Sequence, residues 1–86
     1  MYYAYLLRCA DGTLYGGYTV DLEHRLKQHN SGKGSKYVGA RRPASLVYAE
    51  GFATKEEAMR REYALKHLTR EEKLALVAAY RGEARG

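Results

Sequence analysis

The stretches YYAYLLR (residues 2–8) and TLYGGYT (residues 13–19) decide the fold of this chain. Both are rich in tyrosine, which favours extended backbone, and Asp11-Gly12 lies between them as a turn signal. The pattern therefore predicts a β-hairpin. Gly16-Gly17 inside the second stretch indicates that another element or a ligand approaches its backbone closely.

The rest of the chain predicts one more strand and three helices. Residues 44–52 have the composition of a strand. An N-capping aspartate and two capping boxes, in which a threonine precedes a glutamate by three residues, mark the helix starts. We expect the helices at about residues 21–30, 54–67 and 69–80.

The segment SGKGSKYVGARR (residues 31–42) has three glycines and no apolar periodicity, so it predicts an irregular loop. The resulting fold class is α+β, with a small three-stranded antiparallel sheet flanked by helices in the order β-β-α-β-α-α. We expect one domain over residues 1–80, followed by a polar, frayed tail over residues 81–86.

The excess positive charge of the chain lies in one window. The chain of 86 residues has a net charge of +5, and residues 24–49 carry six Lys or Arg with no Asp or Glu. The remaining nine basic and ten acidic residues nearly balance. Such a window is expected of a surface that faces phosphates, although a solvated basic loop would give the same pattern.

Cysteine usage and hydropathy indicate the compartment. Cys9 is the only cysteine, so no intramolecular disulfide can form, as is usual in a reducing compartment. No run approaches the roughly 20 apolar residues of a membrane span. We therefore expect a cytoplasmic protein that does not contact a membrane.

Two helical stripes place charged groups where apolar residues are expected. Leu22, Arg25, Leu26 and His29 share one stripe of the first predicted helix. Arg25 and His29 could clamp a phosphate and transfer a proton. They could equally be long or polar side chains that pack along their stems and keep their tips in water.

Glu62 interrupts the stripe of the second predicted helix, between Ala58 and Leu65. A carboxylate in a core-facing stripe is costly unless it is paired or bound to a cation. An ion pair with Arg25 or Arg61 would explain it, and so would a metal ion.

Five features, in this order, resemble the catalytic core of the GIY-YIG nucleases: Tyr3-Ala4-Tyr5, Tyr15-Gly16-Gly17, Arg25, Gln28-His29-Asn30 and Glu62. The resemblance covers about residues 2–66. It is strongest to the catalytic domains of endonucleases that cut branched DNA and to small stand-alone bacterial members, and more distant to the N-terminal nuclease domain of UvrC. The first tripeptide departs from the Gly-Ile-Tyr of the family but keeps its tyrosine.

The resemblance implies a role for each site residue. Tyr5 and Tyr15 would be the paired tyrosines, and Tyr15 would act as the general base or would position the water. Arg25 would neutralise the scissile phosphate, and His29 would assist there or in proton transfer. Glu62 would be the sole protein ligand of one Mg²⁺ or Mn²⁺ ion. From the residues alone, both tyrosines are by default half-buried strand residues.

The first hypothesis is a metal-dependent endonuclease that hydrolyses phosphodiester bonds in nucleic acid, most simply branched or single-stranded DNA. Four cations of the basic window would follow the backbone without reading sequence, namely Lys33, Lys36, Arg41 and Arg42. Tyr37 among them could stack on an unpaired base or anchor the loop. The alternative is a nucleic-acid-binding module with a weak or silent nuclease site. A protein-interaction domain that touches no nucleic acid is the third hypothesis.

Overall fold

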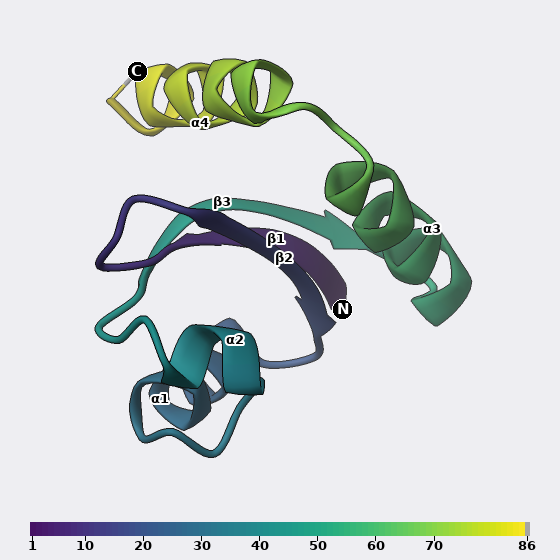
Figure 1. Ribbon diagram of the computed structural model, residues 1–86. Coiled ribbons are helices and arrows are strands. Elements are labelled where there is room, and N and C mark those ends of the chain that lie inside the picture. The colour runs from purple at the N-terminus through teal and green to yellow at the C-terminus, as the bar shows by residue number, and fades with distance from the viewer. Residues whose placement is uncertain (86) are drawn as a thin grey trace.

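The computed structural model describes residues 1–85 and contains seven helices and strands (Figure 1). In chain order they are β1 (Tyr2–Arg8), β2 (Leu14–Thr19), α1 (Leu22–Asn30), α2 (Lys36–Gly39), β3 (Ser45–Phe52), α3 (Lys55–Lys66) and α4 (Arg70–Arg85).

The three strands form one antiparallel sheet in the order β2-β1-β3, so the predicted α+β class is confirmed. The register pairs Tyr5 with Gly17 and Leu7 with Tyr15. Because paired residues of an antiparallel sheet share a face, these four residues lie on the same side of the sheet. A register shift between Leu6 and Leu7 interrupts the pairing of β1 with β3.

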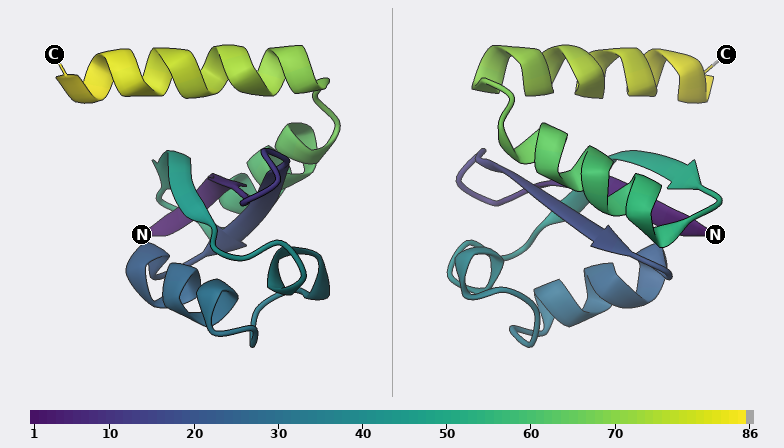
Figure 2. Two further views of the ribbon diagram at one scale, coloured as in Figure 1. Left: turned by 60° about the vertical axis from the view of Figure 1, so that its left-hand side comes forward. Right: turned by 90° about the vertical axis from the view of Figure 1, so that its right-hand side faces the viewer.

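The sheet lies between two pairs of helices, with α1 and α2 on one face and α3 and α4 on the other (Figures 1 and 2). α3 packs against β1 and β2, whereas α4 packs against β3. The central strand β1 is therefore buried on both faces. Its alternate side chains Tyr5 and Leu7 enter one core, and Ala4 and Leu6 enter the other.

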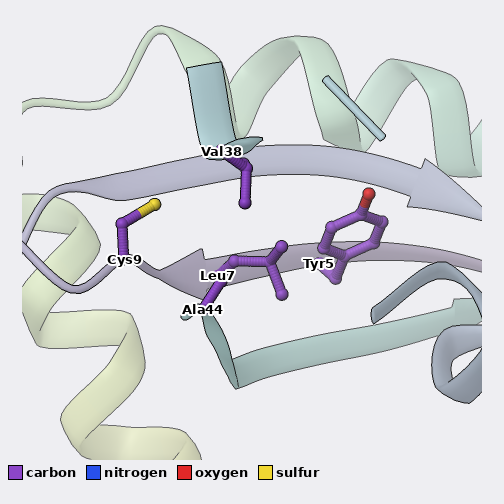
Figure 3. Packing of buried hydrophobic residues seen from close by; sticks show 5 residues of the cluster. All are labelled: Tyr5, Leu7, Cys9, Val38 and Ala44. Atoms are coloured by element: carbon purple, nitrogen blue, oxygen red, sulfur yellow. The ribbon is translucent and has the colours of Figure 1, made fainter. Parts of the chain in front are cut away.

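The core on the α1 and α2 side contains five buried residues (Figure 3): Tyr5, Leu7, Cys9, Val38 and Ala44. The core on the α3 and α4 side is built on Ala4, Leu6, Tyr48 and Leu65. The predicted hairpin, third strand and helix starts all agree with the structure. Asp21 caps α1, and Thr54 and Thr69 accept hydrogen bonds from the backbone amides of the glutamates three residues later.

Two helical segments differ from the sequence expectation. The predicted loop over residues 31–42 is wrong in part, because it contains α2, whose start is capped by the Ser35 hydroxyl. Val38, the only large aliphatic residue of that segment, is fully buried and holds α2 against the sheet. α4 continues to Arg85, beyond the expected end at Tyr80. Whether residues 81–86 fray stays a prediction, and Gly86 lies outside the described residues.

None of the helices in residues 1–85 combines the length and the apolar character that crossing a membrane requires.

Candidate active site

A buried pair of polar side chains joins the centre of the sheet to α1. Tyr5 Oη lies 3.0 Å from His29 Nε2, and only 2% of Tyr5 and none of His29 is exposed. The Ser35 backbone N–H donates to His29 Nδ1 at 3.4 Å. Because an amide N–H can only donate, Nδ1 accepts, and the proton of the neutral ring lies on Nε2. His29 therefore donates to the Tyr5 oxygen.

Arg25 completes this cluster from one turn earlier on α1. Its Nε donates to Tyr5 Oη at 3.4 Å, and its Nη1 donates to Gln28 Oε1 at 3.2 Å. The Tyr5 oxygen thus accepts from both His29 and Arg25, and its own hydroxyl proton remains free to donate elsewhere. A phosphate or water oxygen beside Tyr5 would meet a fixed donor next to a fixed cation.

Burial sets the protonation of this cluster. Desolvation raises the pKa of the Tyr5 phenol above its usual 10.0, an effect that Arg25 partly offsets. Desolvation, and then the charge of Arg25, lowers the pKa of His29 below its usual 6.5. Both side chains are therefore neutral near pH 7, so Tyr5 is a proton donor there and not a base.

Tyr15 lies on the same face of the sheet and contacts residues from three other elements. Its ring meets His29 edge-on at a centroid distance of 5.5 Å and stacks with Tyr37 at 5.8 Å. Lys66 Nζ of α3 lies 5.9 Å from the centre of the Tyr15 ring. The Tyr15 ring therefore lies near side chains of α1 and α2 from one face of the sheet and of α3 from the other.

Glu62 contributes the carboxylate of the site from α3. Ala58 and Leu65 on the same stripe are fully buried, while the Glu62 side chain keeps 23% of its surface exposed. Lys66, whose Nζ lies near both Glu62 Oε2 and the Tyr15 ring, links this carboxylate to the aromatic side chains of the site. The inward stripe is confirmed, but the suggested partners Arg25 and Arg61 are wrong. The partner is Lys66, whose Nζ lies 3.4 Å from Glu62 Oε2.

Glycines make room for the two buried polar rings. A Cβ on Gly17 would overlap the phenol of Tyr5, and a Cβ on Gly34 would overlap the imidazole of His29. A Cβ on the neighbouring Gly16 would point to the other face, toward Lys66 and Leu65. The expected close approach to Gly16-Gly17 is confirmed, and it comes from both faces of the sheet.

The acidic groups of residues 1–85 bear on how a metal ion could be held. No three His, Cys, Asp or Glu side chains gather there as a ligand cluster, and Glu62 is the carboxylate that faces the site. Mg²⁺ commonly keeps several waters and takes one or two carboxylates plus substrate phosphate. The half-buried Glu62 carboxylate pairs with the Lys66 ammonium and with no other cation in this part of the chain, so it could serve as the one carboxylate ligand of such an ion.

The four expected nucleic-acid contacts divide into two kinds. Lys33 and Lys36 are exposed, and neither pairs with a carboxylate within residues 1–85. Arg41 instead pairs with Asp11 at 3.1 Å, and Arg42 Nε donates to the Gly39 carbonyl at 2.8 Å. Arg41 and Arg42 are therefore engaged in contacts that stabilise the α2 segment. Lys33 and Lys36 are the two of the four cations that remain free to contact a backbone phosphate.

Tyr37 on α2 is 39% exposed. Its ring stacks with Tyr15, and the Arg41 guanidinium lies 3.8 Å from its centroid. These contacts favour the loop-anchor interpretation over stacking on a base, because a base would have to displace one of them. Base stacking at Tyr37 stays a prediction.

Sequence reasoning assigned no role to two residues that support the site, Lys66 and Asn30. Lys66 lies four residues after Glu62, a spacing that predicts contact on a helix. The Asn30 side chain brackets Ala44, since it accepts from the Ala44 amide at 2.7 Å and donates to the Ala44 carbonyl at 2.9 Å. The helix spacing could have revealed Lys66, whereas no local signal points to the Asn30 contact across the fold.

Comparison with known proteins adds the family. A family model described as the GIY-YIG catalytic domain matches residues 1–75. A UPF0213 protein from Bacillus pumilus is 61% identical over 72 residues, which cover 84% of this chain and 74% of that protein. A UPF0213 protein from Streptococcus agalactiae is 51% identical over 81 residues, which cover 94% of this chain and 92% of that protein.

Two solved structures share the fold. The solution NMR structure of a UPF0213 protein from Bacillus halodurans is 51% identical with a TM-score of 0.59, and the match covers 92% of this chain and 85% of that one. The solution NMR structure of a protein from E. faecalis is 44% identical with a TM-score of 0.61, and the match covers 93% and 85% of the two chains. The names of these relatives state no reaction. The comparisons therefore support the family and the fold of this chain, and they do not identify a reaction.

Proposed function

We propose, from the premise that this chain belongs to the GIY-YIG catalytic domain family, that it is a divalent-metal-dependent endonuclease acting on DNA. The observation that carries the proposal is the buried Tyr5 hydroxyl, whose oxygen accepts hydrogen bonds from His29 and Arg25. A structural hydroxyl would need one partner. This one has two donors and an uncommitted proton, which is an arrangement that suits binding of an anionic oxygen.

In this proposal Arg25 and Tyr5 bind the scissile phosphate. The Arg25 guanidinium supplies the positive charge, and the Tyr5 hydroxyl donates to a phosphate oxygen while its own oxygen stays held by His29. Because the pKa of Tyr5 is raised, its proton stays in place at neutral pH. These fixed donors would stabilise the charge that develops on the phosphoryl oxygens.

Tyr15 would orient the attacking water, since its hydroxyl end belongs to a ring fixed by His29 and Tyr37. Glu62 would hold one Mg²⁺ or Mn²⁺ ion, which would displace the Lys66 ammonium from the carboxylate. When bound, such an ion acts as a Lewis acid at the phosphate and stabilises a leaving oxygen. The exposed Lys33 and Lys36 would contact flanking phosphates without sequence preference.

A nucleic-acid-binding module with a silent nuclease site is the second candidate. The Glu62–Lys66 ion pair favours it, because this contact already satisfies the carboxylate without a metal. The two candidates differ in what Glu62→Gln does, since only the nuclease depends on that charge for turnover.

The test is cleavage of labelled branched, flapped, single-stranded and duplex DNA in Mg²⁺, Mn²⁺ or EDTA. In a nuclease, Glu62→Gln should lower cleavage by about 100-fold or more, and Tyr15→Phe should also lower it, while both keep their binding affinity. Glu56→Gln, an exposed carboxylate of the same helix, is the matched control and should cut like the wild type. Cleavage that survives Glu62→Gln would contradict the proposal, and tight binding without any cleavage would favour the silent module.

A further inference from the structure

The outward face of α3 carries an exposed aromatic pair that the proposed chemistry does not use. Tyr63 is 66% exposed, and its ring lies 4.1 Å from the ring of His67 at an angle of 31°. Tyr63 lies two residues before the buried Leu65, and at about 100° per residue this turns it away from the sheet. Packing of this domain therefore does not account for the large ring at this position.

The side chains around Tyr63 on the helix surface are those that a nucleic acid prefers. Positions three and four residues away on a helix are its nearest surface neighbours. For Tyr63 they are Met59, Arg60, Lys66 and His67, which include two cations and no carboxylate. Lys66 is also paired with Glu62, whereas no carboxylate pairs with Arg60 within residues 1–85. An aromatic face next to a cation is the combination with which proteins bind single-stranded nucleic acid.

The pair is also held in a fixed arrangement. His67 Nδ1–H donates to the Tyr63 carbonyl oxygen at 2.7 Å, which fixes the imidazole against the phenol ring. A preformed aromatic surface loses little side-chain entropy when a second ring stacks on it. This makes Tyr63 a better stacking partner than an exposed tyrosine without a neighbour.

The position of the pair links it to the candidate active site. Lys66 contacts Glu62 on one side and is the helix neighbour of Tyr63 on the other. Tyr63 also directly follows Glu62 in α3, about 100° further around the helix, so we expect a nucleotide adjacent to a phosphate at Glu62 to pass next to Tyr63. In a duplex the faces of each base are covered by its neighbours, so only an unpaired base can stack there.

We propose that Tyr63, supported by His67, is a stacking platform for an unpaired nucleotide next to the phosphate at the site. The inference rests on the proposed function for its substrate. Binding, however, can be measured independently of cleavage.

The experiment measures binding by fluorescence anisotropy in EDTA, with a labelled single strand and with a blunt duplex of the same sequence. Tyr63→Ala should weaken single-strand binding about 5- to 100-fold, the range expected for the loss of one stacked base. Tyr63→Phe should stay within about twofold of the wild type, because the ring face remains. Duplex binding should change less than about twofold in both variants.

Two controls separate stacking from other effects. Leu74→Ala, at an exposed position of α4 that is 43% accessible, should bind both DNAs like the wild type. A 2-aminopurine base in the single strand should be quenched by the wild type and by Tyr63→Phe, and less by Tyr63→Ala. Thermal unfolding should show that Tyr63→Ala is folded, as expected for a solvent-facing side chain.

Unchanged single-strand binding by Tyr63→Ala would overturn the inference and would leave this face to a protein partner. An equal loss on single strand and duplex would overturn it too, because a non-selective contact would then explain the effect. If the wild type binds single strands through Tyr63 but never cuts DNA, the proposed nuclease fails while the platform stands. If it cuts flaps equally well with and without Tyr63, the platform alone fails.

Discussion

The two faces of the sheet use the same central strand for different purposes. On the α1 and α2 face, the β1 residue Tyr5 leads into a buried polar cluster with His29 and Arg25. On the α3 and α4 face, its neighbours Ala4 and Leu6 pack on apolar groups such as Leu65. Successive side chains of β1 point to opposite faces of the sheet. Neighbouring residues of this strand therefore belong either to the candidate site on the α1 and α2 face, called the site face, or to the apolar core on the α3 and α4 face, called the scaffold face.

The two faces of the sheet also differ in how they place polar side chains. On the site face, the Tyr5 oxygen and both ring nitrogens of His29 have specific partners, which come from β1, α1 and the residue that caps α2. On the scaffold face, the polar side chains Glu50 and Arg61 lie at the margin, where both stay partly exposed. We therefore expect the scaffold face to respond to changes of volume and the site face to changes of partner and pH.

The largest expected effect is on the scaffold face. Leu65 is fully buried and joins α3 to the sheet, so Leu65→Ala should lower the free energy of unfolding by about 2–5 kcal/mol. Urea denaturation measures this loss, and the exposed Leu74→Ala should change stability by less than about 0.5 kcal/mol. Equal effects of the two substitutions would show that α3 does not rest on this core.

Adjacent glycines give a direct comparison of the two faces. Gly17→Ala would place its Cβ against the Tyr5 phenol on the site face, and we expect a loss of about 1–3 kcal/mol from overpacking. Gly16→Ala would point to the scaffold face, where the flexible Lys66 side chain is 3.3 Å away and the other contacts are 3.7 Å or longer. It should cost less than about 1 kcal/mol. Thermal unfolding and cleavage by both variants test this order, and the reverse order would contradict the packing at Tyr5.

The fold could be predicted from the sequence because its signals are local. Turn residues, capping residues and strand-like composition identified the three strands and three of the helices, as the structure confirms. The short α2 was missed because four residues give no periodicity. Its existence depends on burial of Val38 against the sheet, which is a tertiary contact.

The candidate site was predictable in its members and less so in its contacts. The inward stripes that contain Arg25, His29 and Glu62 follow from helix periodicity. That His29 would donate to Tyr5 depends on how α1 packs on the sheet. The Glu62–Lys66 pair, in contrast, lies within α3 at a spacing from which it could have been predicted. Charge alone could not show which cations of the basic window are engaged in contacts within the protein and which are free to bind a phosphate. Arg41, for example, pairs with Asp11, and only the fold brings these two residues together.

A change of partner on the site face should alter the pH dependence of stability. His29→Gln removes a ring that donates to Tyr5 Oη and accepts from the Ser35 amide, so we expect a loss of about 1–3 kcal/mol at pH 7.5. The pKa of His29 is lowered in the folded state, which means that below its ordinary value of 6.5 the unfolded chain takes up the proton first. Wild-type stability should therefore fall as the pH drops below about 6.5 and onward through the folded pKa.

The matched measurement is the slope of stability against pH for the wild type and His29→Gln. The variant should show a shallower decline between pH 6.5 and pH 5, because glutamine does not titrate in that range. His24→Gln, at an exposed position of the same helix, should keep the wild-type slope. A variant of His29 with the full wild-type decline would show that groups other than His29 dominate the acid response.

The smallest expected effect is on the polar margin of the scaffold face. Arg61 Nε lies 3.2 Å from Glu50 Oε1, and the two side chains keep 31% and 45% of their surface exposed. The contact is ionic, because Nε is not aligned for a hydrogen bond. A double-mutant cycle with Glu50→Gln and Arg61→Gln should therefore give a coupling energy of about 0.2–1 kcal/mol that decreases with salt. The Tyr48 hydroxyl also joins this pair, since it donates to Glu50 and accepts from Arg61. A coupling above about 2 kcal/mol that resists salt would mean that these three side chains act as a structured polar network, and the contrast between the faces would no longer be one of apolar scaffold and polar site.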